Sequence, residues 1–517
     1  MNIARRSLSL AFVSVLAACA AATSRPDAIG TEPSIAGARE AFGAHRYAVR
    51  DLVHRYVARI DAIDRKGPAL HAVLAMNPQA GQIAARLDAT SVKDRGALFG
   101  VPVLIKDNID TVDLPTTAGS LALVSSKPSR DAFIVKRLRE AGAIILGKTN
   151  LSEWANLRSS ASTSGWSAVG GLTRNPYGVE RNACGSSSGS GAAIAADLAI
   201  VAVGTETDGS ITCPASVNGV VGIKPTVGLV SRSGIVPISA VQDTAGPMAR
   251  SVADAAALLT VLAGYDPDDP ATASIRDRAP IRYEDHVDAR ALKGARIGVA
   301  RKAAGFHEGV DVVFEHALQV LREQGAILID PADIEKPAHL DENELTALEY
   351  EFKDGINRYL ATRTGSSPRS LAELIAFNDG HKVEEMPYFG QDLFIAAQKR
   401  GSLDDKAYRN ARRATREVAT RLDALFARHH LDALVAPTVG PAWMTDLVNG
   451  DHFSGGGIIG PAAIAGVPHI SVPMGFVQGL PVGLSLVGRA WSEQQLIGYA
   501  YGFEQASHAR VAPASSR

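Results

Sequence analysis

The sequence predicts an α/β fold in which one large mixed β-sheet forms the core and helices cover both of its sides. Short apolar runs alternate with segments of helical period along most of the chain, a pattern typical of a sheet covered by helices. Apolar residues make up 46% of the 517 positions, so the chain can bury a large core. The 48 glycines suit a protein with many tight backbone approaches.

The first 19 residues are predicted to be an export signal. Two arginines precede an apolar run from Ser7 to Leu16, which is too short to span a bilayer. The run leads into Leu-Ala-Ala-Cys, ending at Cys19, which resembles a bacterial lipobox, whose cysteine carries the lipid. The alternative is an ordinary signal peptide cut within alanines 20–22. We expect an exported bacterial protein, periplasmic or membrane-anchored through this lipid alone, with residues 20–37 as a tether.

Helices and strands of the core are predicted between residues 38 and 263. Apolar residues recur at helical spacing over 38–64, 131–142 and 251–263, and a further helix begins at 192–196. Ser251 is placed to cap the helix that follows it. Short buried strands are predicted at 100–105, at 143–146, where Gly147 ends the strand, and at 200–203. Because 159–191 is dominated by Ser, Gly and Asn, we expect mostly loop there.

The character of the chain changes over about 266–430. Charged residues are denser there, and helical period recurs over 310–324, 342–362 and 406–428. Strand character returns at 434–436 and 470–472. We therefore predict one domain over 38–512 that contains a mostly helical insert.

Composition excludes several functions. The 53 Lys and Arg residues balance 54 Asp and Glu residues, so no broad basic surface for nucleic acid is predicted. No grouping of Cys and His has zinc-ligand spacing, and we expect neither a metal nor a cofactor. Cys184 and Cys213 can pair, but with only three cysteines in the chain we expect two buried free thiols.

A dense glycine and serine run, Ala-Cys-Gly-Ser-Ser-Ser-Gly-Ser-Gly, spans 183–191. A flexible linker is disfavoured because the run lies between apolar segments, and a phosphate-binding loop is disfavoured because no Lys-Ser or Lys-Thr follows at the Walker spacing. A catalytic loop fits best. Residues 185–189 also match Gly-x-Ser-x-Gly, which would make Ser187 a nucleophile with His452 or His469 downstream, but that pattern is short and weak alone.

A polar turn, Gly-Thr-Glu-Thr-Asp-Gly-Ser-Ile, covers 204–211 directly after a predicted strand. Successive peptide N–H groups in such a turn can converge on an anion. The candidate oxyanion-hole donors are the N–H groups of Thr207, Asp208, Gly209 and Ser210. Ser210 is then well sited to attack a carbonyl carbon, although the segment taken alone is better explained as a turn without chemistry.

Lys106 is the candidate base for that serine. It ends an apolar run, which is an unusual place for a charge unless the lysine faces a polar site. The alternative is a side chain that reaches solvent from a strand end. Free lysine has a pKa of about 10.4 and cannot act as a base near neutral pH. Burial can lower that pKa by several units, which is how serine/lysine hydrolases activate a hydroxyl.

Together these three segments resemble the amidase signature family. Its motif is a long Gly/Ser stretch followed by Gly-Thr-[Asp/Glu]-Thr-x-Gly-Ser and then Gly-x-Lys-Pro-Thr, which stands here at 222–226. The match continues over 242–248, 466–475 and 479–483, and so covers roughly residues 40 to 505. The resemblance implies the amidase signature fold and a serine amidohydrolase that works through an acyl-enzyme.

Carried over by position, the resemblance implies a Ser-Ser-Lys triad. Ser210 would be the nucleophile, Ser186 the proton shuttle and Lys106 the base. It also implies a cis peptide bond before Ser186. Asp243 and Arg250 are predicted to support the site by hydrogen bonds or to form a structural ion pair.

Two segments narrow the resemblance to the bacterial peptide amidases, which release ammonia from C-terminally amidated peptides. These are Thr-Glu-Thr-Asp-Gly-Ser at 205–210 and Leu-Ser-Glu-Trp-Ala-Asn at 151–156. Many family members have Gly in place of Asp208, and Glu206 replaces a commoner Asp. We expect a small-molecule or peptide amide as substrate and a monomer or homodimer.

Other functions compete with this prediction. Within enzymes they are a broad-specificity short-chain or aryl amidase, a fatty-amide hydrolase and the A subunit of the transamidosome. The export signal argues against that subunit, and no apolar docking element favours the fatty-amide hydrolase. From another class, the chain could be a catalytically silent binding lipoprotein of the same fold, but Lys106, Ser186 and Ser210 are all present.

Overall fold

The computed structural model describes residues 29–91 and 95–514. The predicted export signal, including Cys19, lies outside these residues, as does the first part of the predicted tether. Within the described residues, no helix is both long enough and apolar enough to cross a membrane.

One mixed sheet of 11 strands forms the centre of the molecule, in the order β1-β3-β2-β8-β10-β9-β14-β15-β13-β11-β12. Strand β2 pairs in parallel with β3 and β8, whereas β8 pairs antiparallel with β10. The single large mixed sheet confirms the predicted fold class. In chain order the strands are β1 Val73–Met76, β2 Pro102–Lys106, β3 Ile144–Thr149, β8 Val201–Glu206, β9 Val221–Lys224, β10 Thr244–Ala249, β11 Arg296–Val299, β12 Ile327–Ile329, β13 Ala433–Pro437, β14 His469–Val477 and β15 Leu480–Val487.

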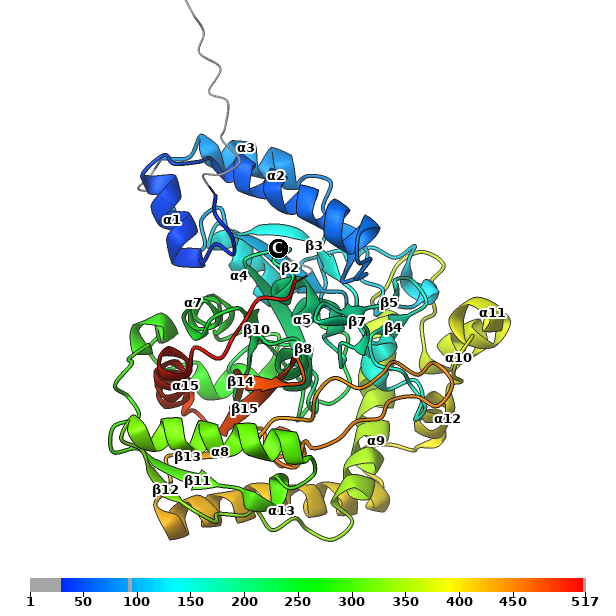
Figure 1. Cartoon of the computed structure of the whole chain (residues 1–517). Helices are drawn as coiled ribbons and strands as arrows, with labels where there is room; N and C mark the ends of the chain where they lie inside the picture. Colours follow the sequence, from blue (N-terminus) through cyan, green and yellow to red (C-terminus); the bar gives the residue numbers. More distant parts are fainter. Residues whose placement is uncertain (1–28, 92–94, 515–517) are drawn as a thin grey trace, which may run out of the picture.

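Helices cover the sheet, and two short hairpins lie outside it (Figure 1). Helices α7, α8 and α15 lie against strands β10 and β14, and the short helices α5 and α6 pack beside β8 and β14. The hairpins are β4 Trp166–Ser167 with β5 Gly171–Leu172, and β6 Arg174–Asn175 with β7 Gly178–Asn182. The helices are α1 Ile35–Gly43, α2 Val49–Arg59, α3 Ala80–Asp88, α4 Phe133–Glu140, α5 Ser188–Ala195, α6 Thr212–Val217, α7 Val252–Leu262, α8 Glu308–Glu323, α9 Leu340–Ala361, α10 Leu371–Gly380, α11 Lys382–Glu385, α12 Asp392–Lys399, α13 Lys406–His429, α14 Ile459–Ile464 and α15 Glu493–Ser507.

Several predicted boundaries differ from the structure, and one predicted cap agrees with it. Helix α5 begins at Ser188, inside the predicted loop, and not at 192–196. The hydroxyl of Ser251 accepts a hydrogen bond from the N–H of Asp254 and so caps α7, as predicted. The helix expected over 38–64 is divided into α1 and α2. Gly147 does not end its strand, since β3 continues through it to residue 149. There the glycine allows close strand pairing, because a Cβ atom would lie 2.3 Å from the carbonyl oxygen of Ala75.

The region 266–430 is mostly helical but also extends the sheet. Strand β11 pairs in parallel with β13 on one side and with β12 on the other, which places two strands at one sheet edge. Neither strand was predicted, because only helical period was found over 266–430. Helices α9 and α12 build a second apolar cluster, in which Phe352 and Phe394 stack and Trp154 of the core joins them. The region therefore packs against the segment that contains Trp154.

Candidate active site

Lys106 is completely buried at the end of β2, the third strand from one edge of the sheet. This burial lowers the pKa of its ammonium to about 7, although the carboxylates of Glu206 and Asp243 act in the opposite direction. A substantial fraction of Lys106 is therefore a neutral amine near neutral pH. Such an amine can accept a proton.

Three oxygen atoms surround the amine of Lys106. Its Nζ lies 2.8 Å from Oγ of Ser186, 2.9 Å from Oγ1 of Thr205 and 3.2 Å from the carbonyl oxygen of Thr205. A neutral amine has two N–H groups and one lone pair. The two N–H groups can bind both oxygens of Thr205, and the lone pair is then left to accept the hydroxyl proton of Ser186.

Ser186 lies in the glycine and serine loop that leads into α5. The Gly185–Ser186 peptide bond is cis, as the resemblance implied. The carbonyl oxygen of Ser186 accepts a hydrogen bond from the N–H of Ser152 at 3.1 Å. Gly185 permits this close packing, because a Cβ atom there would lie 2.1 Å from Oγ of Ser152.

Ser210 ends the turn between β8 and α6. Its carbonyl oxygen accepts a hydrogen bond from the N–H of Ser187 at 3.1 Å, which joins this turn to the glycine and serine loop. Ser210 is 9% exposed whereas Ser186 is fully buried, so Ser210 is the more accessible of the two serines. The geometry thus places the two candidate serines on adjoining loops.

The predicted oxyanion-hole turn is built to leave N–H groups free. Gly209 has φ +75°, a left-handed conformation that favours glycine. The carboxylate of Glu206 accepts hydrogen bonds from the N–H groups of Ile211 and Thr212 at 2.7 and 2.9 Å, which fixes the start of α6. Within 29–91 and 95–514, no group accepts a hydrogen bond from the N–H of Asp208, Gly209 or Ser210. These three donors can therefore face an anion.

The hydroxyl of Ser187, the alternative nucleophile, is hydrogen-bonded to the protein backbone. Its hydroxyl donates to the carbonyl oxygen of Thr205 at 3.1 Å and accepts from the N–H of the same residue at 3.2 Å. His469 is buried against Ser485, and His452 pairs with Asp446. The structure therefore brings neither histidine into contact with Ser187.

Asp243 and Arg250 lie in different surroundings. The carboxylate of Asp243 accepts from the hydroxyl of Thr207 at 2.6 Å and from the N–H groups of Ile238 and Ser239 at 2.8 and 2.9 Å. Burial raises the pKa of Asp243 to about 6 despite these bonds. Arg250 instead donates to backbone carbonyl groups and pairs with Asp197, so it supports the core.

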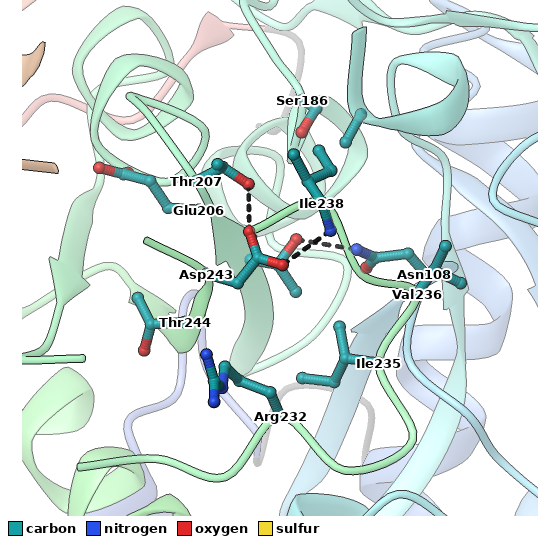
Figure 2. A pocket seen from close by; sticks show the side chains of 12 residues that line it. Asn108, Ser186, Glu206, Thr207, Arg232, Ile235, Val236, Ile238, Asp243 and Thr244 are labelled. Atoms are coloured by element: carbon teal, nitrogen blue, oxygen red, sulfur yellow. Dashed lines mark hydrogen bonds between the residues drawn. The ribbon is translucent and has the colours of Figure 1, made fainter. Parts of the chain in front are cut away.

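A small polar cavity lies beside Ser186 (Figure 2). Its volume of about 10 Å³ corresponds to roughly one water molecule. Asn108, Thr205, Thr207 and Asp243 contribute to its wall. Asn108 and Thr205 were not predicted as site residues, although Asn108 stands only two positions after Lys106 and Thr205 lies in the turn motif.

Cys184 and Cys213 form a disulfide, so the expectation of two free thiols was wrong. Their Cα atoms lie 6.1 Å apart although 29 positions separate them. Spacing along the chain could not reveal this proximity, because it results from the packing of the two candidate serine loops. The bridge is buried with Val217, Val439 and Trp443 and ties these loops together.

Comparison with known proteins gives a consistent result along most of the chain. A family model described as Amidase matches residues 51–497. A protein of Arabidopsis thaliana named as a probable amidase is 41% identical over 495 residues, which cover 93% of this chain and 91% of that protein. The crystal structure of native peptide amidase from Stenotrophomonas maltophilia has a TM-score of 0.89 and 49% identity, with 94% and 99% of the chains covered. The structure of the peptide amidase PAM with the competitive inhibitor chymostatin has a TM-score of 0.89 and 50% identity, with 93% and 99% covered.

Proposed function

This chain belongs to the amidase family and is an amide-hydrolysing enzyme, and from that premise we propose that it removes ammonia from C-terminally amidated peptides. In this proposal Ser210 is the nucleophile, Ser186 the proton shuttle and Lys106 the base. The observation that carries these three roles is the buried contact of 2.8 Å between Nζ of Lys106 and Oγ of Ser186.

The reaction begins with two proton transfers. Neutral Lys106 takes the hydroxyl proton of Ser186 while Ser186 takes that of Ser210. Oγ of Ser210 attacks the carbonyl carbon of the amide, and the carbonyl oxygen becomes an oxyanion. The free N–H groups of the turn from Thr207 to Ser210 bind this oxyanion.

Collapse of the tetrahedral intermediate releases ammonia. Ser186 returns a proton to the leaving nitrogen, which departs as ammonia, and the acyl group remains esterified to Ser210. A water molecule then attacks this ester with the same base, and the free acid is released. The three residues end in their original protonation states, so the cycle needs no cofactor.

The substrate class rests on similarity. Half of the aligned residues are identical to those of PAM, a named peptide amidase, over almost the whole chain. Export would bring the enzyme into contact with peptides outside the cytoplasm. A broad-specificity short-chain or aryl amidase is the alternative, and an amidase fold without activity is the alternative from another class.

The test is ammonia release from a C-terminally amidated dipeptide by the mature protein and by Lys106→Ala and Ser210→Ala. We expect release by the wild type alone. If the wild type hydrolyses simple amides but not the dipeptide, the substrate class is wrong and the mechanism stands. Full activity of Lys106→Ala on any amide would refute the triad.

We also propose that the protein is exported and anchored by lipid on Cys19. The full-length chain produced in a bacterium should incorporate radiolabelled palmitate and sediment with membranes, whereas Cys19→Ala should do neither. A labelled Cys19→Ala variant, or an unlabelled wild type recovered in the periplasm, would contradict lipidation.

A further inference from the structure

The hydroxyl of Thr205 contacts two side chains at once. Oγ1 of Thr205 lies 2.9 Å from Nζ of Lys106 and accepts a hydrogen bond from Nδ2 of Asn108, also at 2.9 Å. All three residues are buried. Asn108 therefore faces the candidate base through one shared oxygen atom.

We propose that Asn108 is a positioning residue that keeps Lys106 in its neutral, reactive form by acting through the hydroxyl of Thr205. The inference rests on the proposed function, in which Lys106 is the base. It assigns to Asn108 control over the proton affinity of that base rather than contact with the substrate.

The physical reason lies in the hydrogen-bonding capacity of a hydroxyl oxygen. Such an oxygen has two lone pairs, and N–H groups of Asn108 and Lys106 occupy both. The positive ends of two N–H dipoles then converge on one atom. Their mutual repulsion is strongest when Lys106 carries a full positive charge. The amide of Asn108 therefore destabilises the ammonium form relative to the amine.

The charged groups around Lys106 make this contribution necessary. The carboxylates of Glu206 on β8 and of Asp243 before β10 both favour the ammonium form. Asp107 is the neighbour of Lys106 in the chain, but its carboxylate is paired with Lys148 at 2.8 Å. Burial and the Asn108 amide act against the carboxylates of Glu206 and Asp243. An acidic side chain at position 108 would join them instead.

The carbonyl oxygen of the Asn108 side chain faces a cavity that can hold its hydrogen-bond partner. In the part of the chain that the structure describes, no group donates to Oδ1 of Asn108. The residue lines the polar cavity beside Ser186 and Asp243 (Figure 2). A cavity with room for about one water can satisfy this oxygen. The amide can therefore direct its N–H group at Thr205 without leaving its oxygen unpaired.

The experiment is the pH dependence of kcat/KM for amide hydrolysis by the full mature protein. Its acid limb reports the pKa of the base in the free enzyme. Asn108→Ala removes one N–H dipole and should move the midpoint of the acid limb to higher pH by about half a pH unit. Asn108→Asp adds a carboxylate and should move this midpoint to higher pH by about one pH unit or more. Asn175→Asp is the matched control, because Asn175 is equally buried but donates to the backbone of Asn182 and Val217.

Each outcome decides the inference. An upward shift in the Asn108 variants that is absent in Asn175→Asp supports it. The inference is overturned if Asn108→Ala has the Tm of the wild type and an acid limb at the same pH. If Asn108→Asp fails to fold, the result for Asn108→Ala alone is used. Lys106→Ala, assayed alongside, separates the two hypotheses: if it stays active, the triad itself is wrong. If it is inactive and the Asn108 limbs do not move, only the role of Asn108 is wrong.

Discussion

Nζ of Lys106 lies 2.8 Å from Oγ of Ser186 although 80 positions separate the two residues in the chain. The contact forms because β2, which ends at Lys106, pairs in parallel with β8, and the glycine and serine loop packs on the end of β8 through Ser187. A buried amine on one element thereby contacts the hydroxyl of a serine on another.

Activity should depend on pH through this amine. The pKa of Lys106 is lowered to about 7, and the base must be neutral, so activity should rise as pH increases through that value. Below it, kcat/KM should fall by about tenfold per pH unit. Lys106→Arg should be inactive at every pH, because a guanidinium is not deprotonated in proteins. A flat profile between pH 5 and 8 would contradict the assignment.

Substitution of Ser210 and substitution of Ser187 should have very different effects on kcat. Ser210→Ala is expected to lower kcat by about 10⁴-fold or more, as removal of a nucleophile does in serine hydrolases. Ser187→Ala is the matched control, because the hydroxyl of Ser187 binds the backbone of Thr205. It should keep kcat within about tenfold and reduce the free energy of unfolding by roughly 1 kcal/mol. Steady-state kinetics measure kcat, and urea denaturation measures the free energy of unfolding. A larger loss of kcat in Ser187→Ala than in Ser210→Ala would favour Ser187 as nucleophile.

Asp243 should matter through Thr207, the first residue of the oxyanion turn. Asp243→Ala removes the acceptor of three hydrogen bonds and should lower kcat by about 10- to 100-fold with little change in KM. Asp64→Ala is a suitable control, since Asp64 lies in the helical turn Ile60–Lys66 and its carboxylate also accepts two backbone N–H groups, those of Ala72 and Val73 at the start of β1. If both variants lose stability alike and neither loses kcat, Asp243 has only a structural role.

The disulfide should contribute strongly to stability. It closes a loop with a sequence separation of 29, and a bridge of this length stabilises a fold by about 3.5 kcal/mol. The double variant Cys184→Ser/Cys213→Ser should unfold at a lower temperature than the wild type. Dithiothreitol should lower the Tm of the wild type toward that of the variant and leave the variant unchanged. Equal Tm values without reductant would show that the bridge does not form in solution.

Local pattern predicted many elements and located the candidate residues. Helix α7 was predicted from the spacing of its apolar residues, and its cap was predicted from Ser251. Both signals depend on residues within about one helical turn of each other. The strand before Lys106 was predicted from its apolar run. Motif resemblance identified Lys106, Ser186 and Ser210, and the structure brings Lys106 and Ser186 into contact. Their chemical roles stay predictions until the substitutions are measured.

The sequence by itself determined the class of fold, the family and the residues to examine, because period and motif are properties of adjacent positions. Only the tertiary structure decided which distant residues meet. The pairing of Cys184 with Cys213, the strands β11 and β12 at the sheet edge, and the contact of Asn108 with Thr205 all join separate segments. Such contacts depend on how strands order themselves and how loops pack upon them. Long-range packing leaves no period or spacing in the chain from which these contacts could be predicted.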